Sequence, residues 1–127
     1  MADVNRGNRP LSPHLTVYRW QITMAMSILH RITGVGLALG AILGVWWFIA
    51  AATDAEYFAS VDGFLTSWFG LLILFFSLVA FWYHFCNGIR HLVWDTGHAF
   101  EIDAVTKTGY AAIAGAAVLT IVTLIAA

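Results

Sequence analysis

Three long stretches without formal charge constrain this chain more than any other feature of its sequence. They run over residues 32–52, 63–89 and 108–127, and a single histidine, His84, interrupts the middle one. Each stretch reaches the roughly 20 residues that a helix needs to cross a bilayer. In hydrocarbon, every backbone N–H and C=O must be bonded, and a helix achieves this within its own segment whereas an open strand does not. The sequence therefore predicts an all-α membrane protein with three transmembrane helices.

The composition indicates one membrane domain. The 127 residues are 61% hydrophobic and only 10% charged, which is too apolar for a soluble domain. Nucleic acid is a poor candidate partner, because the formal net charge is −1 and no Lys/Arg cluster is present. We expect a single membrane-anchor domain over residues 1–127, with an N-terminal interfacial segment at 1–27 and transmembrane helices at approximately 28–52, 63–93 and 105–127.

The basic residues predict the orientation of these helices. All six lie before the first uncharged stretch or between the second and third: Arg6, Arg9, Arg19, Arg31, Arg90 and Lys107. The segment 53–62 between the first two helices carries acidic charges only. Because basic loops stay on the cytoplasmic side, the N-terminus should be cytoplasmic and the C-terminus outside. The expected location is a bacterial inner membrane, or a mitochondrial inner membrane with the N-terminus in the matrix.

His84 is the first candidate for chemistry, since ionisable groups at membrane depth are costly and usually functional. At 1.5 Å per residue it lies about 9 Å below the level of Arg90. The imidazole could bond a neighbouring helix, or it could ligate haem iron. Gly88, one turn away, leaves room for a porphyrin face. Groups able to receive haem propionates lie at the inner ends of the first two helices: His30, Arg31, Arg90 and His91.

A second axial ligand for such a haem is missing from this sequence. The uncharged stretches of the first and third helices contain neither His nor Met, and His30, His91 and His98 lie too near the surface. If a six-coordinate haem is bound, the second ligand must come from another chain.

Ser27, His30 and Arg31 form a second candidate group. Their spacing of i, i+3 and i+4 places all three on one face of a helix. A hydroxyl and a guanidinium there could hydrogen-bond a quinone carbonyl and stabilise the negative charge that develops on reduction. Alternatively, Ser27 caps the helix and Arg31 reaches lipid headgroups. Both interpretations stay open at this point.

Three motifs occur in order along the chain. They are RPLSPHL at residues 9–15 with Tyr18 following, SILHRITG at 27–34, and HFCNGIRHLVWD at 84–95. Together they resemble the cytochrome b anchor subunit of succinate dehydrogenase, respiratory complex II. The resemblance implies that His84 is an axial ligand of haem b, that Ser27 and Arg31 line a ubiquinone pocket, and that His30 lies with Arg31 near a haem propionate.

The resemblance also implies partners: a flavoprotein subunit, an iron–sulfur subunit and a second membrane anchor that shares the haem in a heteromeric helix bundle. This chain has a single cysteine, Cys86, and no dinucleotide fingerprint, so it should hold neither an iron–sulfur cluster nor FAD. It would complete a succinate:quinone oxidoreductase whose dicarboxylate site is in another chain. A fumarate reductase anchor and a non-redox structural anchor are the alternatives.

Overall fold

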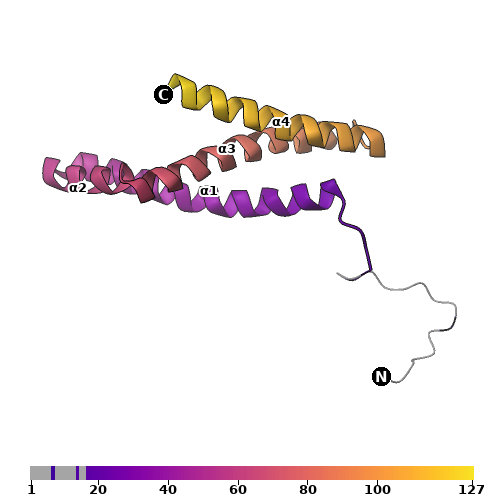
Figure 1. The fold of residues 1–127 in the computed structure, drawn as a ribbon, viewed down its shortest axis with the longest axis horizontal. Helices are drawn as coiled ribbons and strands as arrows, with labels where there is room; N and C mark the ends of the chain where they lie inside the picture. The colour runs from indigo at the N-terminus through magenta and orange to yellow at the C-terminus, as the bar shows by residue number, and fades with distance from the viewer. Residues whose placement is uncertain (1–6, 8–13, 15–16) are drawn as a thin grey trace.

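Four helices make up the described part of the chain, residues 7, 14 and 17–127 of a computed structural model. They are α1 (Ile22–Thr53), α2 (Ala55–Leu65), α3 (Trp68–Asp95) and α4 (Ile102–Ala126) (Figure 1). Three of them, α1, α3 and α4, are long and apolar enough to cross a membrane. The predicted all-α fold with three spans is confirmed.

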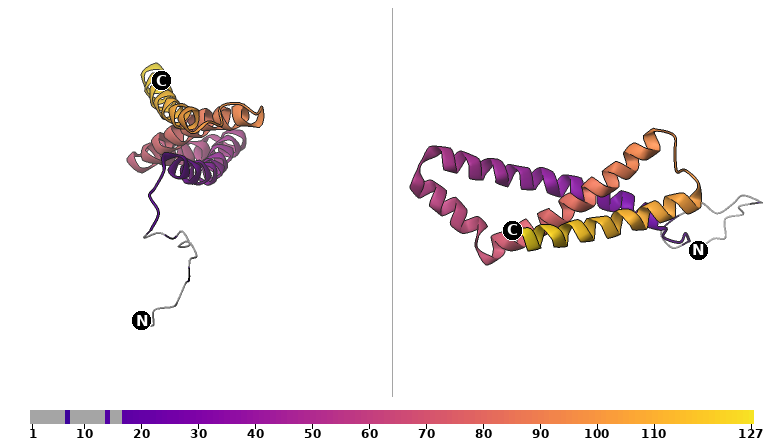
Figure 2. Two further views of the ribbon diagram at one scale, coloured as in Figure 1. Left: turned by 90° about the vertical axis from the view of Figure 1, so that its right-hand side faces the viewer. Right: turned by 90° about the horizontal axis from the view of Figure 1, so that it is seen from above.

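The central helix of the arrangement is α3. It packs against both α1 and α4, whereas α1 and α4 contact each other less. The start of α1 and the connection between α3 and α4 lie at one end of the molecule, and α2 and the C-terminus lie at the other (Figures 1 and 2). Groups near the start of α1 therefore lie beside the last turns of α3.

The first span begins earlier than the sequence predicts. Helix α1 starts at Ile22 after Gln21, so residues 22–27 of the expected interfacial segment are helical. A tertiary contact accounts for the extra turns: Met26 is buried, and its sulfur lies 3.0 Å from where a Cβ on Gly109 of α4 would be. Most of the expected segment 1–27, including most of the RPLSPHL motif, falls outside the described residues.

The expected connection at 53–62 contains most of a further helix, α2. Asp54 caps it, because its carboxylate accepts a 2.8 Å hydrogen bond from the backbone N–H of Tyr57. The indole N–H of Trp47 on α1 donates to the Asp62 carboxylate at 3.0 Å, which holds α2 against α1. A search for uncharged spans overlooks this helix because α2 is short and carries acidic residues.

A tight turn after α2 moves the second span to a later start than predicted. Ser67 caps α3 by accepting a 3.2 Å bond from the N–H of Gly70. Gly70 lies directly against the backbone carbonyls of Phe64 and Leu65, where a Cβ would collide. The predicted second helix at 63–93 thus begins at Trp68, and residues 63–65 belong to α2.

Very little of the described chain is enclosed. The buried apolar side chains are Met26, Ala50, Val61, Leu65, Ala112 and Ala116, and most large apolar side chains are exposed. Small residues at the α3–α4 contact let the two helices approach closely, as is common in membranes. So much exposed apolar surface fits lipid and other membrane chains better than water.

Candidate functional site

Three histidines gather where the start of α1 meets the end of α3. The rings of His30 on α1 and His84 on α3 are stacked, with centroids 3.8 Å apart and planes 9° from parallel. His91 on α3 lies close to His30 as well, at 5.1 Å between centroids. The structure thus brings together three histidines that the sequence analysis named as candidates for a haem site.

The hydrogen bonds of His84 fix which ring nitrogen carries its proton. Its Nδ1 lies 3.1 Å from the backbone carbonyl oxygen of His30 and 3.2 Å from Oγ1 of Thr33. A carbonyl only accepts, so Nδ1–H is the donor and Nε2 of the neutral ring keeps a free lone pair. Within the described chain Nε2 has no hydrogen-bond partner. Metal-ligating histidines have this arrangement, with one nitrogen donating to a carbonyl and the other left for the metal.

The surface of α1 is shaped to receive the His84 ring. A Cβ on Gly34 would lie only 3.1 Å from Cε1 of His84, so the ring fits closely because residue 34 has no side chain. Next to it, the Thr33 hydroxyl is held by the backbone carbonyl of Leu29 at 2.8 Å. One turn further along α3, a Cβ on Gly88 would have no atom within 4 Å, which agrees with the space that the sequence predicts there. The His84 ring therefore lies next to an open space beside Gly88 on α3.

His30 contains a buried polar atom that lacks a partner. Its Nδ1 is enclosed and makes no hydrogen bond within the described residues. Leaving such an atom unsatisfied costs about 1–3 kcal/mol, so buried polar groups are nearly always bonded. A group from outside the described chain would relieve this cost. Among the described residues no cluster of three or more His, Cys, Asp or Glu could hold a metal ion, so iron here would need other ligands, such as the nitrogens of a porphyrin.

Ser27 and Arg31 have different surroundings in the structure. Ser27 lines a cavity of about 400 Å³ at this end of the bundle, together with Thr23, Met24, Ile28, Arg90, His91 and Trp94. Arg31 does not line that cavity. Its side chain is exposed and forms no hydrogen bond or ion pair with the described residues. Arg31 is therefore available to a neighbouring chain or a ligand lying against the outside of α1.

Arg90 has a role that the sequence did not reveal. The residue is only 6% exposed and its guanidinium lies over the Trp94 ring at 4.0 Å, so Arg90 packs within this chain and is not at the surface, where the sequence placed it. It donates to Thr108 Oγ1 at 3.2 Å and to the Val105 carbonyl at 2.9 Å, both on α4. A third bond, of 3.3 Å, goes to the buried Asn87. The available signal in the sequence was the polar pair Asn87 and Arg90, spaced i, i+3 inside an apolar helix.

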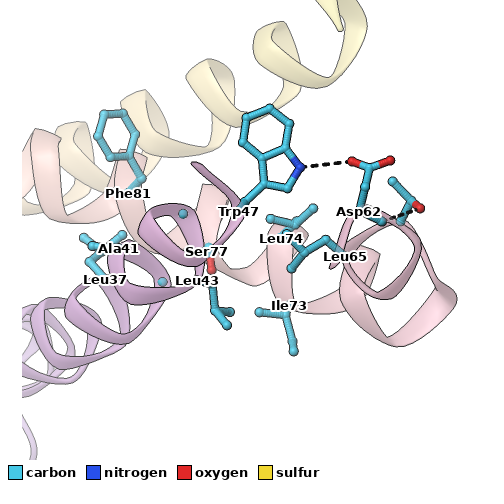
Figure 3. A pocket seen from close by; sticks show the side chains of 13 residues that line it. Leu37, Ala41, Leu43, Trp47, Asp62, Leu65, Ile73, Leu74, Ser77 and Phe81 are labelled. Carbon is cyan, nitrogen blue, oxygen red and sulfur yellow. Dashed lines mark hydrogen bonds between the residues drawn. The ribbon is translucent and has the colours of Figure 1, made fainter. Parts of the chain in front are cut away.

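A larger cavity of about 660 Å³ lies toward the other end, between α1, α2 and α3 (Figure 3). Its walls are mainly apolar, and the carboxylate of Asp62 in its wall accepts the indole N–H of Trp47. Size alone favours this cavity as a ligand site. No histidine or basic residue lines it, so the groups suited to redox cofactors lie at the histidine cluster instead.

Comparison with known proteins identifies the family of this chain. Residues 5–123 match the family of succinate dehydrogenase/fumarate reductase transmembrane subunits. The succinate dehydrogenase cytochrome b556 subunit of Paracoccus denitrificans is 50% identical over 125 residues, 98% of this chain and 96% of that protein. The corresponding subunit of Rickettsia conorii is 41% identical, over 89% of this chain and 88% of that protein. A cytochrome b560 subunit of succinate dehydrogenase from Reclinomonas americana is 44% identical, over 81% of this chain and 75% of its own.

Proposed function

Because this chain belongs to the family of succinate dehydrogenase/fumarate reductase transmembrane subunits, we propose that it holds haem b through His84. The chain is a membrane-anchor subunit of succinate dehydrogenase and hence part of an oxidoreductase complex. The relatives are named as cytochromes b, and His84 is the membrane-depth histidine with a free Nε2 lone pair. When bound, haem b supplies a site that takes up and gives away one electron.

The observation that carries this proposal is the hydrogen bond from His84 Nδ1–H to the His30 carbonyl. It orients the ring, sets the tautomer and raises the basicity of Nε2, as outer partners of metal ligands do. The bond also agrees with the plainer interpretation of His84 as a residue that bonds a neighbouring helix. The two roles are compatible, since they use different nitrogens of the ring.

The second axial ligand comes from another chain in our proposal. His30 is the histidine nearest to His84, but the two rings face each other in parallel. Two rings stacked in this way would not both hold one iron, so His84 would hold the haem from this chain and another chain would supply the second ligand. His30 would instead lie near a haem propionate, and the exposed Arg31 lies next to it in sequence. The haem is thus shared with a second membrane anchor.

Ubiquinone is the proposed electron acceptor, with Ser27 and Arg31 as its contacts. The cavity beside Ser27 supports this, because a hydroxyl from α1 and a buried guanidinium from α3 are among the groups that line it. Arg31 would approach the quinone from outside that cavity, at the junction with a partner chain. The flavoprotein and iron–sulfur subunits are the remaining partners, and the dicarboxylate is oxidised in the flavoprotein.

We further propose that the whole chain is one membrane-anchor domain in a bacterial or mitochondrial inner membrane. Its N-terminus lies in the cytoplasm or matrix, and its C-terminus lies outside. The distribution of basic residues supports this orientation. The structure agrees with it in one respect: the start of α1 and the α3–α4 connection lie at the same end (Figure 1).

The test is an optical difference spectrum of the complete complex purified in mild detergent. His84→Ala should abolish or strongly perturb the reduced-minus-oxidised b-type band, while the other subunits still co-purify. His98→Ala is the matched control, since His98 is exposed in the loop after α3 and should leave the band unchanged. A normal band in the His84→Ala complex would refute the assignment.

A further inference from the structure

Asn87 connects two neighbours on α3 through its side-chain amide. It is fully buried, at 0% exposure. Its Oδ1 accepts a hydrogen bond from Nη1 of Arg90 at 3.3 Å, and its Nδ2 lies 3.3 Å from Nε2 of His91. The three side chains form a short series from Arg90 through Asn87 to His91.

The chemistry of these groups allows the hydrogen bonds to run in only one direction, with Arg90 donating to Asn87 and Asn87 donating to His91. A guanidinium has donors and no acceptor, so the amide of Asn87 must turn its oxygen toward Arg90. Its NH₂ group then faces His91, and an amide NH₂ only donates. Nε2 of His91 must accept, which leaves the proton of the neutral ring on Nδ1. Arg90 cannot reverse this order, because contacts with Thr108 and Val105 on α4 hold it in place.

The ring of His91 is also held in orientation. Trp94 contacts it edge to face, with centroids 5.0 Å apart and planes at 82°, and the centroid of the His30 ring lies 5.1 Å away. Nδ1 of His91 has no hydrogen-bond partner in the described chain, and it is not among the enclosed polar atoms. A fixed donor therefore remains open to an acceptor from elsewhere.

His91 and Ser27 line the same cavity of about 400 Å³. We propose that His91 is a further quinone-binding residue, whose Nδ1–H donates a hydrogen bond to a quinone carbonyl oxygen in this cavity, and that Asn87 and Arg90 are positioning residues that set its tautomer. The inference rests on the proposed function in one respect, that the cavity beside Ser27 receives the quinone. The serine hydroxyl and the imidazole N–H would then be donors from α1 and α3 to one ligand.

The first measurement is of the tautomer. Protonated and unprotonated imidazole nitrogens have well-separated ¹⁵N shifts, so solid-state NMR of the ¹⁵N-histidine-labelled complex reports each ring, and His91→Asn identifies the signals of His91. Near neutral pH, the neutral His91 ring should carry its proton on Nδ1. Asn87→Leu should give a mixture of tautomers. A proton on Nε2 in the unmodified complex would overturn the proposal.

The second measurement is the KM for a short-chain ubiquinone in the assembled complex. Loss of one neutral hydrogen bond corresponds to about a two- to tenfold change, so His91→Leu should raise KM by that factor. His91→Asn keeps an amide N–H near the position of Nδ1 and should recover part of the loss. His98→Leu should change nothing, and none of these variants should alter succinate oxidation with an acceptor that acts upstream of the quinone.

Ser27→Ala separates the two ideas. If Ser27→Ala raises KM and His91→Leu does not, the quinone site stands and the role of His91 is wrong. If only His91→Leu raises KM, the assignment of Ser27 is wrong and that of His91 stands. If neither variant changes KM, the cavity is not the quinone site, and both are refuted.

Discussion

Replacing Gly34 by alanine should displace His84, the proposed haem ligand, while leaving the helix intact. The new Cβ would lie 3.1 Å from Cε1 of His84 and 3.7 Å from its Nδ1. Carbon atoms pack best at about 3.5–4.0 Å, so the ring must move by about 0.4–0.9 Å. The bond from Nδ1 to the His30 carbonyl is already 3.1 Å long, and such a movement away from α1 takes it beyond hydrogen-bonding distance.

The expected consequence is weaker haem binding. Losing the outer partner of a metal-ligating histidine typically costs about ten- to a hundredfold in metal affinity. The fold itself should not suffer, since Gly→Ala inside a helix is favourable by about 1 kcal/mol. Lower haem occupancy without lower helix stability is therefore the expected signature.

Gly36→Ala is the matched control. It adds the same methyl group two residues further along α1, where nothing lies within 4 Å of the new atom. The assay compares haem per complex, from the reduced-minus-oxidised spectrum, before and after challenge with a haem-scavenging apoprotein. Only Gly34→Ala should lose haem faster. Equal retention by the two variants would refute the proposed packing between Gly34 and His84.

Three other outcomes follow from the structure and the sequence. Arg31→Ala should reduce quinone reductase activity by about ten- to a hundredfold, since a charged hydrogen bond is worth about 1.5–3 kcal/mol. Arg31→Lys should recover part of that activity, because it keeps the charge but not the planar guanidinium. An equal loss of succinate oxidation with an acceptor that acts upstream of the quinone would contradict a quinone role for Arg31. Gly70→Ala should destabilise the complex by about 1–3 kcal/mol in thermal unfolding, because the methyl group collides with the carbonyls of Phe64 and Leu65, whereas the unobstructed Gly63→Ala should not. A reporter fused after Ala127 should be active only on the outer side of the membrane, and activity inside would overturn the proposed orientation.

Local sequence was least informative where polar side chains meet across helices. The motif SILHRITG placed Ser27, His30 and Arg31 on one helical face, yet in the structure Ser27 lines a cavity and Arg31 does not. Helical spacing fixes angles around one axis only. Which side of α1 faces α3 depends on how the two helices pack, and in the structure Arg31 lies outside the cavity that Ser27 lines.

The role of Arg90 illustrates the same limit. Its position at the boundary of an uncharged stretch suggested a surface cation, but α4 covers it and supplies two oxygen acceptors. Asn87 was overlooked for the same reason. One buried amide in an apolar helix becomes informative only when the groups on both of its sides are known.

The sequence by itself determined that the chain has three membrane spans, and it pointed to His84 within the second. Lipid penalises charge and unbonded backbone residue by residue, so a one-dimensional pattern is sufficient for such conclusions. Only the tertiary structure decided that α2 is a helix held against α1, that Gly34 accommodates the ring of His84, and that the Nδ1 proton of that ring is bonded to His30. Residues 30 and 84 are 54 positions apart in the chain. Which atoms meet over that separation depends on how α1 and α3 pack, and no local pattern specifies that packing.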